Sequence, residues 1–451
     1  MNTSRRKFLK TGLGALAYAG APQTSSTGGS TILKGGRVLS LDPAVGDFDK
    51  ADVLIQGSKI VSVQPNIRAS AKVIDASNMI VMPGFVDTHR HAWEAPLRNI
   101  LPNGLLTDYT RDITGTARAA YRPEDAYVGD LVTALGAINA GVTTMLDWSH
   151  IGNSPEHTDA AIRGLKESGI RAVYAFGGGA PGPSNQFPQD IRRLRKQYFS
   201  SEDQLLTLAM AAGVNPADWA VAREVGAPIT VHVNAANQLM PIADAVKSDV
   251  TCVHANNLTE AEWQLVAKAG AHISIACAIE MEMGHGVPAI QPALDHGIKP
   301  SLSLDVETEM PGDFFTQMRA VFTLQRMQRL ARERAGEKNV PALLTVREVV
   351  EFATVQGSKD NRLDRKVGTL TPGKDADIIL LRTDQINVMP INNAYGAVVL
   401  GMDTSNVDSV FIAGKLMKSQ GKLVGIDMAR ITRLLNQSRE YITSKTGLGR
   451  G

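Results

Sequence analysis

Short apolar, β-branched runs separated by Gly, Asp and Asn lie near both ends of the chain. Residues 30–83 include TILKGGRVLS, ADVLIQG and KIVSVQ, and the same texture returns in VGTLTPGKDADIILLRTD and VDSVFIAGKLMKSQGKLV. Runs of this length with turn residues between them are typical of small antiparallel sheets. We therefore predict that residues 30–83 and 366–425 build one composite β-sandwich.

The middle of the chain, residues 84–365, alternates apolar runs with helix-like segments such as YRPEDAYVGDLVTALGAINA and TEAEWQLVAKAG. Eight strands alternating with helices predict an α/β protein with a (β/α)8 TIM-like barrel. The eight predicted strands lie within residues 84–91, 141–150, 169–178, 205–213, 228–236, 250–257, 272–280 and 300–308.

Two segments stand outside this alternation. Residues 98–120 are long for a connection and poor in helix signal, so we predict that they fold over the barrel mouth as a lid. Residues 426–451 contain MARITRLLNQSREYI, which has the spacing of one amphipathic helix and predicts a helical tail.

The first 29 residues differ from the rest in composition. TSRRKFLKTGLGALAYAGAPQ places Arg5 and Arg6 before a short, weakly apolar stretch and a linker rich in Ser, Thr and Gly. This order resembles a twin-arginine export signal. The apolar part is too short to span a bilayer, so we expect it to be removed, leaving no membrane anchor on a periplasmic or extracellular protein.

The charge of the chain bears on its possible partners, and its cysteines bear on possible disulfides. Lys plus Arg number 47 against 45 Asp plus Glu, a net charge of +2, so no basic field is present to hold nucleic acid. The two cysteines, Cys252 and Cys277, both lie in apolar runs predicted as strands. We interpret them as buried free thiols, with a disulfide between neighbouring strands as the alternative.

Histidines and one aspartate fall at the carboxyl ends of four predicted strands, where barrel enzymes carry their catalytic groups. Side chains two apart on a strand share a face. His89 and His91 thus share a face with Trp93, and His232 shares one with Asn234. His254 and Asp305 end the sixth and eighth predicted strands. The pattern places four imidazoles and one carboxylate at one mouth.

This donor set predicts a hydrolytic metal site. Neutral imidazoles and a carboxylate suit Zn²⁺ or Fe²⁺, with one position left open for water. The metal would lower the pKa of that water and so make hydroxide available near neutral pH. A lone His-x-His pair is weak evidence, because buried structural histidines are common. Agreement among four strand ends makes the prediction specific.

Three further side chains lie near the predicted mouth. His150 follows the second strand and is expected to contact substrate. His285, in EMEMGHGVP, has either a substrate-facing or a loop-packing role. Asp147 is predicted to share an inward face with Thr143 and Met145, either at the site or as a structural carboxylate beneath it.

These residues resemble the amidohydrolase superfamily over nearly the whole chain after the leader. The resemblance is carried by MPGFVDTHRH, GVTTMLD, ITVHV, VTCVHANNLTEAE, SLSLD and VGTLTPGKDADIILL, and is greatest to the cytosine deaminase, chlorohydrolase and guanine deaminase branch. It implies one metal held by His89, His91, His232 and Asp305. It also implies that His254 polarises the bond attacked and that Asp305 accepts the proton of the attacking water. No lysine ends the fourth strand to bridge a second metal.

One departure from this branch bears on the reaction. Its deaminases usually carry His-x-x-Glu at strand five, with the glutamate moving a proton to the ring and to the leaving ammonia. Here the glutamate position holds Ala235, which cannot move a proton. Because general acid–base help contributes about 10²- to 10⁴-fold, deamination needs a replacement, for which Glu280, Glu282 and Glu307 are the candidates.

We therefore expect a metal-dependent hydrolase that cleaves an amide, lactam or imide C–N bond of a small cyclic or aromatic substrate. Hydrolytic deamination of a heterocycle is the alternative within this class. A non-catalytic, metal-containing protein that binds a small molecule is the alternative outside it. A homo-oligomer is expected because relatives are often oligomeric. The substrate contacts expected are Trp93, His150, Asn234, Glu307 and His285.

Overall fold

Eight parallel strands form a nearly closed barrel, and the eight predicted strand segments all contain one of them. The computed structural model describes residues 29–449, so residues 1–28 of the predicted export signal lie outside the described residues. Hydrogen bonding follows chain order from β6 to β13. The strands are β6 (Phe85–Arg90), β7 (Val142–Gly152), β8 (Arg171–Gly178), β9 (Leu206–Ala212), β10 (Ile229–Val233), β11 (Val250–His254), β12 (His272–Ile275) and β13 (Ser301–Leu302).

The barrel closes between β13 and β6 at the predicted site. Just after β13, the Asp305 amide donates to the His89 carbonyl at 2.9 Å, and the His91 amide donates to the Asp305 carbonyl at 2.8 Å. Closure therefore fixes the backbone of three predicted site residues relative to one another.

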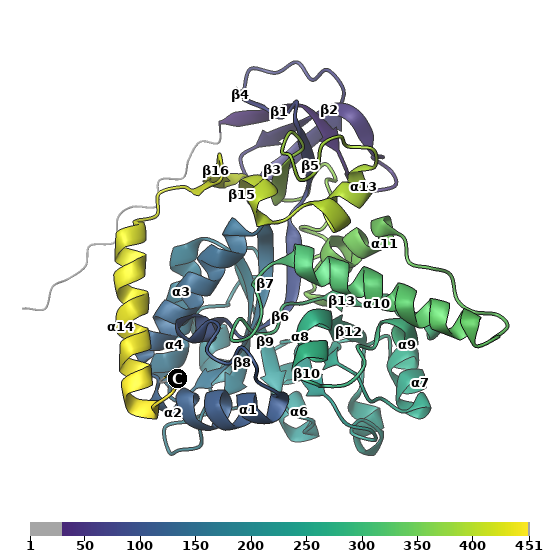
Figure 1. Ribbon diagram of the computed structural model, residues 1–451. Coiled ribbons are helices and arrows are strands. Elements are labelled where there is room, and N and C mark those ends of the chain that lie inside the picture. Colours follow the sequence, from purple (N-terminus) through teal and green to yellow (C-terminus); the bar gives the residue numbers. More distant parts are fainter. Residues whose placement is uncertain (1–28, 450–451) are drawn as a thin grey trace, which may run out of the picture.

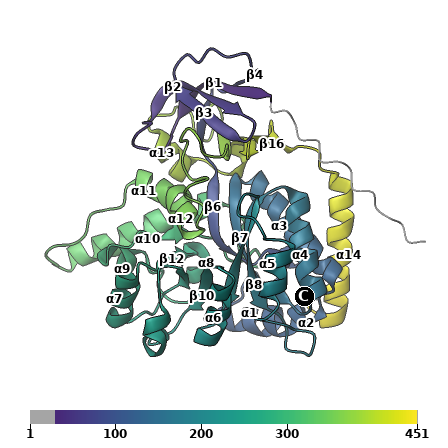
Figure 2. The ribbon, with the colours of Figure 1, turned by 180° about the vertical axis from the view of Figure 1, so that it is seen from behind.

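Helices surround the strands in both views of the ribbon (Figures 1 and 2). The α7 helix shows how the sequence sets its limits: the Thr259 hydroxyl and the Glu262 side chain form a capping box, and Gly270 ends the helix in a left-handed conformation. The longer helices are α3 (Pro123–Asn139), α4 (Pro155–Ser168), α6 (Pro216–Glu224), α7 (Glu260–Ala269), α10 (Phe314–Arg334) and α14 (Met428–Thr446).

The shorter helical elements are α1 (Leu106–Tyr109), α2 (Arg118–Ala120), α5 (Ile191–Gln197), α8 (Cys277–Glu282), α9 (Ile290–Asp295), α11 (Val346–Glu351), α12 (Gly357–Asp360), α13 (Ala394–Gly396), η1 (Ala92–Leu97), η2 (Thr110–Ala117), η3 (Met240–Ala245), η4 (Phe352–Gln356), η5 (Ala397–Gly401) and η6 (Thr404–Asn406). No helix among residues 29–449 is both long and apolar enough to cross a membrane.

A separate β domain from both chain ends sits above the barrel in Figure 1, which confirms the predicted fold class. Its nine strands form one mixed sheet, in which β5 pairs antiparallel with β14 and so joins the two ends of the chain. The strands are β1 (Ser30–Val38), β2 (Phe48–Gln56), β3 (Lys59–Gln64), β4 (Lys72–Asp75), β5 (Met79–Pro83), β14 (Ile378–Arg382), β15 (Val407–Ile412), β16 (Lys415–Ser419) and β17 (Lys422–Leu423).

The GKDADI motif ties this domain to the barrel. Arg171, at the start of β8, donates to both carboxylate oxygens of Asp377 at 2.9 and 3.0 Å, and also to Asp375 at 2.9 Å. The Arg171 and Asp377 side chains are almost fully buried. This motif is therefore structural.

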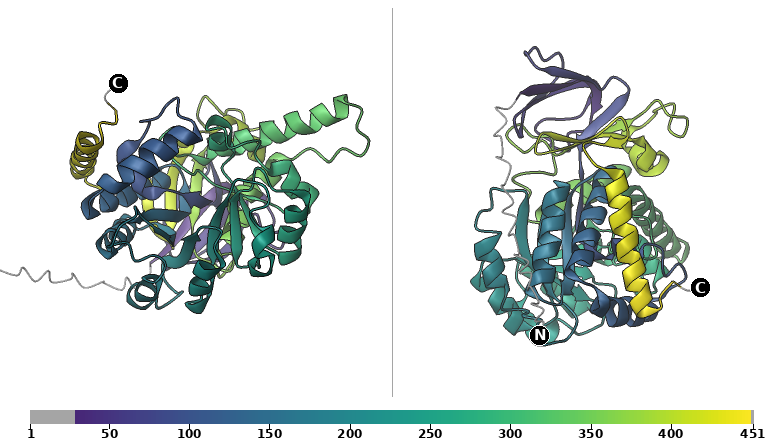
Figure 3. Two further views of the ribbon diagram at one scale, coloured as in Figure 1. Left: turned by 90° about the horizontal axis from the view of Figure 1, so that it is seen from below. Right: turned by 90° about the vertical axis from the view of Figure 1, so that its left-hand side faces the viewer.

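Two predictions about local structure need correction. Cys277 begins α8 and is not on a strand, because β12 ends at Ile275; it and Cys252 are buried and free. Residues 98–120 are largely helical, through α1, η2 and α2. They lie at the barrel end away from the β domain, beside the predicted tail helix α14 (Figures 1 and 3).

Candidate active site

The five predicted metal and catalytic residues meet at the carboxyl ends of the strands. His89 Nε2 lies 3.1 Å from Asp305 Oδ1 and 3.2 Å from His232 Nε2, and His91 Nε2 lies 3.4 Å from the same Asp305 oxygen. Bonds of about 2.0–2.1 Å in a tetrahedral zinc site place neighbouring ligand atoms about 3.3–3.4 Å apart. The donor set and its spacing therefore fit one small divalent metal.

The protonation states of three of these side chains also suit metal binding. Burial, reinforced by the other histidines, lowers the pKa of His91 to about 3 and that of His232 well below its usual value. Burial acts to raise the pKa of Asp305, but the His89 hydrogen bond and nearby imidazoles outweigh it and hold that pKa well below the usual range. His91 and His232 are therefore neutral, and Asp305 is ionised, near pH 7.

A backbone contact orients His91. Its Nδ1 lies 2.8 Å from the carbonyl oxygen of Trp148, which can only accept, so Nδ1 carries the proton. The lone pair of Nε2 is then directed at the cluster. Such partners orient metal-ligating histidines in general.

His254 is held by a buried carboxylate on its far side. Its Nδ1 lies 3.0 Å from Glu280 Oε1, whereas its Nε2 faces Asp305 Oδ2 at 3.8 Å. Glu280 also accepts from the Ala276 amide at 2.8 Å and from Asn256 Nδ2 at 3.2 Å. Burial opposes protonation of His254, but the Glu280 hydrogen bond and the Asp305 charge outweigh it and raise the pKa of His254.

Two of these residues have unusual backbones. His254 and Asp305 have φ angles of 71° and 64°, in the left-handed region that side chains other than glycine rarely adopt. Such conformations cost about 1–3 kcal/mol each and cluster at active sites, where surrounding structure maintains them. Both residues predicted to act on the substrate are thus held in strained backbone positions.

A cavity of about 210 Å³ opens beside the cluster. Its lining combines site residues with side chains of the lid and of the loops after β10, β12 and β13: His91, Leu106, Tyr109, Thr110, Thr114, His150, His232, Asn234, His254, Met283, His285, Asp305 and Val306. The predicted lid therefore contributes to the cavity wall. Among the described residues of this lining, Asp305 is the only carboxylate.

Three predicted substrate contacts, His150, Asn234 and His285, line this cavity, but Trp93 and Glu307 do not. The strand β6 ends at Arg90, and Trp93 enters η1, where it is fully buried. Glu307 turns away because Arg90 donates to it at 2.8 Å and Arg98 pairs with its other oxygen.

The predicted inward direction of Asp147 was wrong, and the alternative of a structural carboxylate holds. It is Leu146 and Trp148 that pack inside the barrel, whereas Met145 packs against the surrounding helices. Asp147 Oδ1 accepts from the Ala92 amide at 3.1 Å, outside the cavity. Asp147 therefore supports the backbone next to His91 and does not face substrate.

Sequence reasoning missed the lid residue Tyr109. Its hydroxyl donates to the buried Glu94 at 2.6 Å, which anchors α1 over the cavity. Tyr109 stands in a polar segment without a clear period, so no pattern identified its inward direction. Its neighbours Leu106 and Met283 give the cavity its apolar side.

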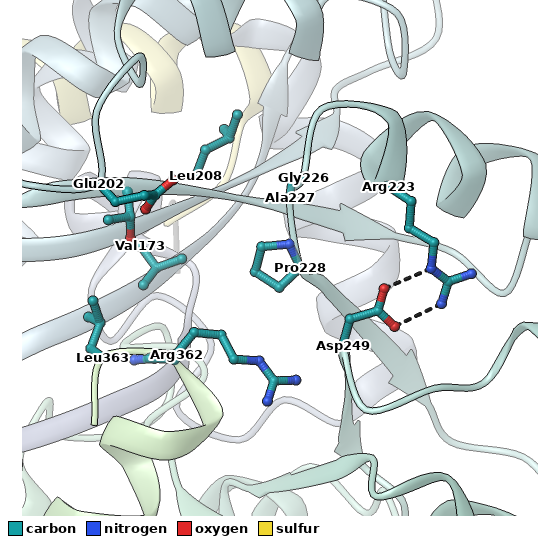
Figure 4. A pocket seen from close by; sticks show the side chains of 12 residues that line it. Val173, Glu202, Leu208, Arg223, Gly226, Ala227, Pro228, Asp249, Arg362 and Leu363 are labelled. Carbon is teal, nitrogen blue, oxygen red and sulfur yellow. Dashed lines mark hydrogen bonds and ion pairs between the residues drawn. The ribbon is translucent and has the colours of Figure 1, made fainter. Parts of the chain in front are cut away.

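A larger cavity of about 510 Å³ lies at the opposite, amino-terminal ends of the strands (Figure 4). Its charged groups include Arg223 and Asp249, which pair with each other at 2.7 and 2.8 Å. Within residues 29–449, no histidine or cysteine belongs to its lining. The smaller cavity beside the histidines is therefore the candidate active site.

Comparisons with known proteins identify the family to which the chain belongs. The model of the amidohydrolase family matches residues 80–417. The chain is 22% identical to 5-methylthioadenosine/S-adenosylhomocysteine deaminase of Pyrococcus horikoshii, covering 89% of this chain and 98% of that protein. It is also 22% identical to 5'-deoxyadenosine deaminase of Methanosarcina barkeri, covering 92% and 98%.

Two solved structures share the fold. A zinc-bound adenosine deaminase from Xanthomonas campestris has a TM-score of 0.79 at 20% identity, covering 92% of this chain and 98% of its own. A mutant of the atrazine chlorohydrolase TrzN from Arthrobacter aurescens, complexed with zinc and atraton, has a TM-score of 0.80 at 20% identity, covering 91% and 100%. With a family match over most of its length, the chain belongs to the amidohydrolase family and is a hydrolase acting on carbon–nitrogen bonds.

Proposed function

We propose that the protein hydrolyses an amide, lactam or imide bond of a small cyclic or aromatic substrate. The observation that carries this proposal is the pairing of one carboxylate, Asp305, with one imidazole, His254, at the cavity. The described lining holds no second carboxylate that could move another proton. Hydrolysis of an amide needs only one proton moved from water to the leaving nitrogen.

One divalent metal completes this site in the proposal. His89, His91, His232 and Asp305 would hold it, with zinc favoured and iron as the alternative. Zinc is supported by the neutral imidazole donors and by its presence in the two similar solved structures. When bound, the metal would act as a Lewis acid that lowers the pKa of water.

The protein's own groups then carry the proton. Asp305 Oδ2, the oxygen nearer His254, accepts a proton from the attacking water and returns it to the nitrogen as the C–N bond breaks. The Glu280 carboxylate accepts from His254 Nδ1, so a protonated His254 presents its Nε2–H toward the substrate carbonyl oxygen. That N–H stabilises the negative charge that develops on the oxygen.

Deamination of a heterocycle is the second candidate, and the names of the curated relatives favour it. Against it, Ala235 is exposed and offers no acid, and Glu280 lies behind His254, outside the cavity lining. Glu307 is paired with two arginines. Glu282, the third candidate, also lies outside the cavity lining, so none of the three candidate glutamates supplies the second acid that this reaction needs.

Glu280→Gln should lower kcat about tenfold to a hundredfold, with KM and metal content nearly unchanged. The neutral amide keeps the shape of Glu280 but removes the charge that stabilises protonated His254. Steady-state kinetics and metal analysis check this. Glu282→Gln, in the same helix but outside the cavity lining, is the matched control. Equal loss of activity and metal in the Glu280 variant would contradict a role through His254.

We also propose export by the twin-arginine route, supported by the order of Arg5, Arg6 and the apolar stretch. Replacing both arginines by lysine should keep the protein in the cytoplasmic fraction of cells of its source or of a host with this route. Unchanged secretion of the double variant would contradict the proposal.

A further inference from the structure

One wall of the active-site cavity carries polar groups that lack partners. Asn234 Oδ1 and both ring nitrogens of His285 are buried, and none has a hydrogen-bond partner among the described residues. Leaving a buried polar group unpaired costs free energy, so such groups point to a ligand or to ordered water. Because these groups line the cavity beside Asp305, a bound substrate is well placed to pair with them.

The backbones that carry these side chains are fixed. The Asn234 amide donates to Gln238 Oε1 at 2.8 Å, and its carbonyl accepts from Asn257 Nδ2 at 2.7 Å. Asn257 also reaches the His285 carbonyl at 3.4 Å. Asn257 thus joins the loops after β10 and β12, so the two side chains form one preorganised wall.

His150 adds a donor whose position is set by Trp93. The indole Nε1 lies 2.9 Å from His150 Nδ1. An indole N–H can only donate, so Nδ1 must accept, and the proton of the neutral imidazole is on Nε2. His150 lines the cavity, and its ring stacks on that of His91 at 4.1 Å with parallel planes. His150 therefore presents a fixed N–H beside the metal cluster.

The wall formed by His150, Asn234 and His285 offers both hydrogen-bond donors and hydrogen-bond acceptors, and none of these three side chains is charged. His150 donates, Asn234 Oδ1 accepts, and a neutral His285 does one of each at its two nitrogens. Burial lowers the pKa of His285, which keeps it neutral. In the part of the chain that the structure describes, no lysine or arginine lines the cavity to pair with an anion. An anionic group held against this wall, away from His254 and the metal ligands, would lose its hydration without compensation.

We propose that His150, His285 and Asn234 determine specificity by recognising an uncharged ring through an edge that carries both C=O and N–H, and that Trp93 positions His150 for this contact. The inference rests on the proposed function for the placement of the scissile bond at Asp305. A –CO–NH– edge is the group that satisfies the donor and the acceptors of the wall together. An anionic or purely apolar ring leaves some of them unpaired.

Binding of three related rings to the zinc-loaded protein tests this. Uracil has the edge, 1,3-dimethyluracil lacks both N–H groups, and orotate adds a carboxylate. Titration calorimetry should show that uracil binds at least about tenfold more tightly than either analogue. His150→Leu should weaken uracil binding about three- to tenfold, whereas His150→Gln, which keeps a donor near the Nε2 position, should nearly restore it. Metal content must stay equal across variants.

The role of Trp93 has a spectroscopic readout. In protein labelled with ¹⁵N-histidine, the His150 signals should show a single Nε2–H tautomer, identified by their loss in His150→Gln. Trp93→Phe should produce a mixture of tautomers and weaken uracil binding to a similar extent as His150→Leu. A single tautomer in Trp93→Phe would overturn the positioning role.

Four results would overturn the proposed role of His150, His285 and Asn234 in specificity. They are no uracil binding, equal binding of 1,3-dimethyluracil, tighter binding of orotate, or unchanged uracil binding in His150→Leu. Uracil binding requires no turnover, so a failure of the proposed hydrolysis leaves this test valid. Conversely, an enzyme that hydrolyses cyclic amides while His150→Leu binds uracil normally would retain the proposed function and refute the wall.

Discussion

His232→Ala should remove the metal and abolish hydrolysis together. His232 Nε2 approaches the cluster to 3.2 Å from His89 Nε2, and its ring belongs to one of the two groups of donor atoms that lie within 4.8 Å of one another. Loss of an outer partner of a metal ligand already costs about 10- to 100-fold in metal affinity or activity, so loss of a ligand should cost more. Elemental analysis after dialysis measures the metal.

His296→Ala is the matched control for this change. His296 caps α9, contacts Glu260 at 3.1 Å and lies outside the active-site cavity lining. It should keep full metal and full activity. Retention of metal by His232→Ala, or equal loss in the control, would contradict the assignment of His232 as a ligand.

Asp305→Asn should reduce kcat by about 10²- to 10⁴-fold, the usual contribution of a positioned proton acceptor. The amide preserves size and one oxygen, so folding should change little and part of the metal should remain. It cannot accept the proton of water. Rates are therefore compared per bound metal. A variant with normal turnover per metal would show that another group carries the proton.

The strand pattern predicted the barrel because its strands are apolar and its connections begin with clear signals, as at Thr259 before α7. The clustering of His89, His91, His232 and Asp305 was predictable because they stand at strand ends, where position along the chain determines position in space. For these elements, local sequence and tertiary structure agree.

The predictions that the structure contradicts or that the sequence did not allow have physical causes. Every residue of β7 is buried, so its pattern cannot distinguish the inner face from the outer, and Asp147 was assigned to the wrong side. Trp93 lies beyond the end of β6, where the two-residue period no longer holds. Glu280 reaches His254 only because α8 begins directly after a short strand, a placement that no local pattern encodes.

The direct test of the proposed hydrolysis is mass spectrometry of products from a panel of cyclic amides, imides and amino-substituted heterocycles. The zinc-loaded protein is compared with His232→Ala under the same conditions. We expect products of the wild-type protein that have gained one water, from ring or amide opening, and none from the variant. Products in which an amino group has been replaced by oxygen would show that deamination proceeds with Ala235 in place of the glutamate, and would contradict the proposed reaction.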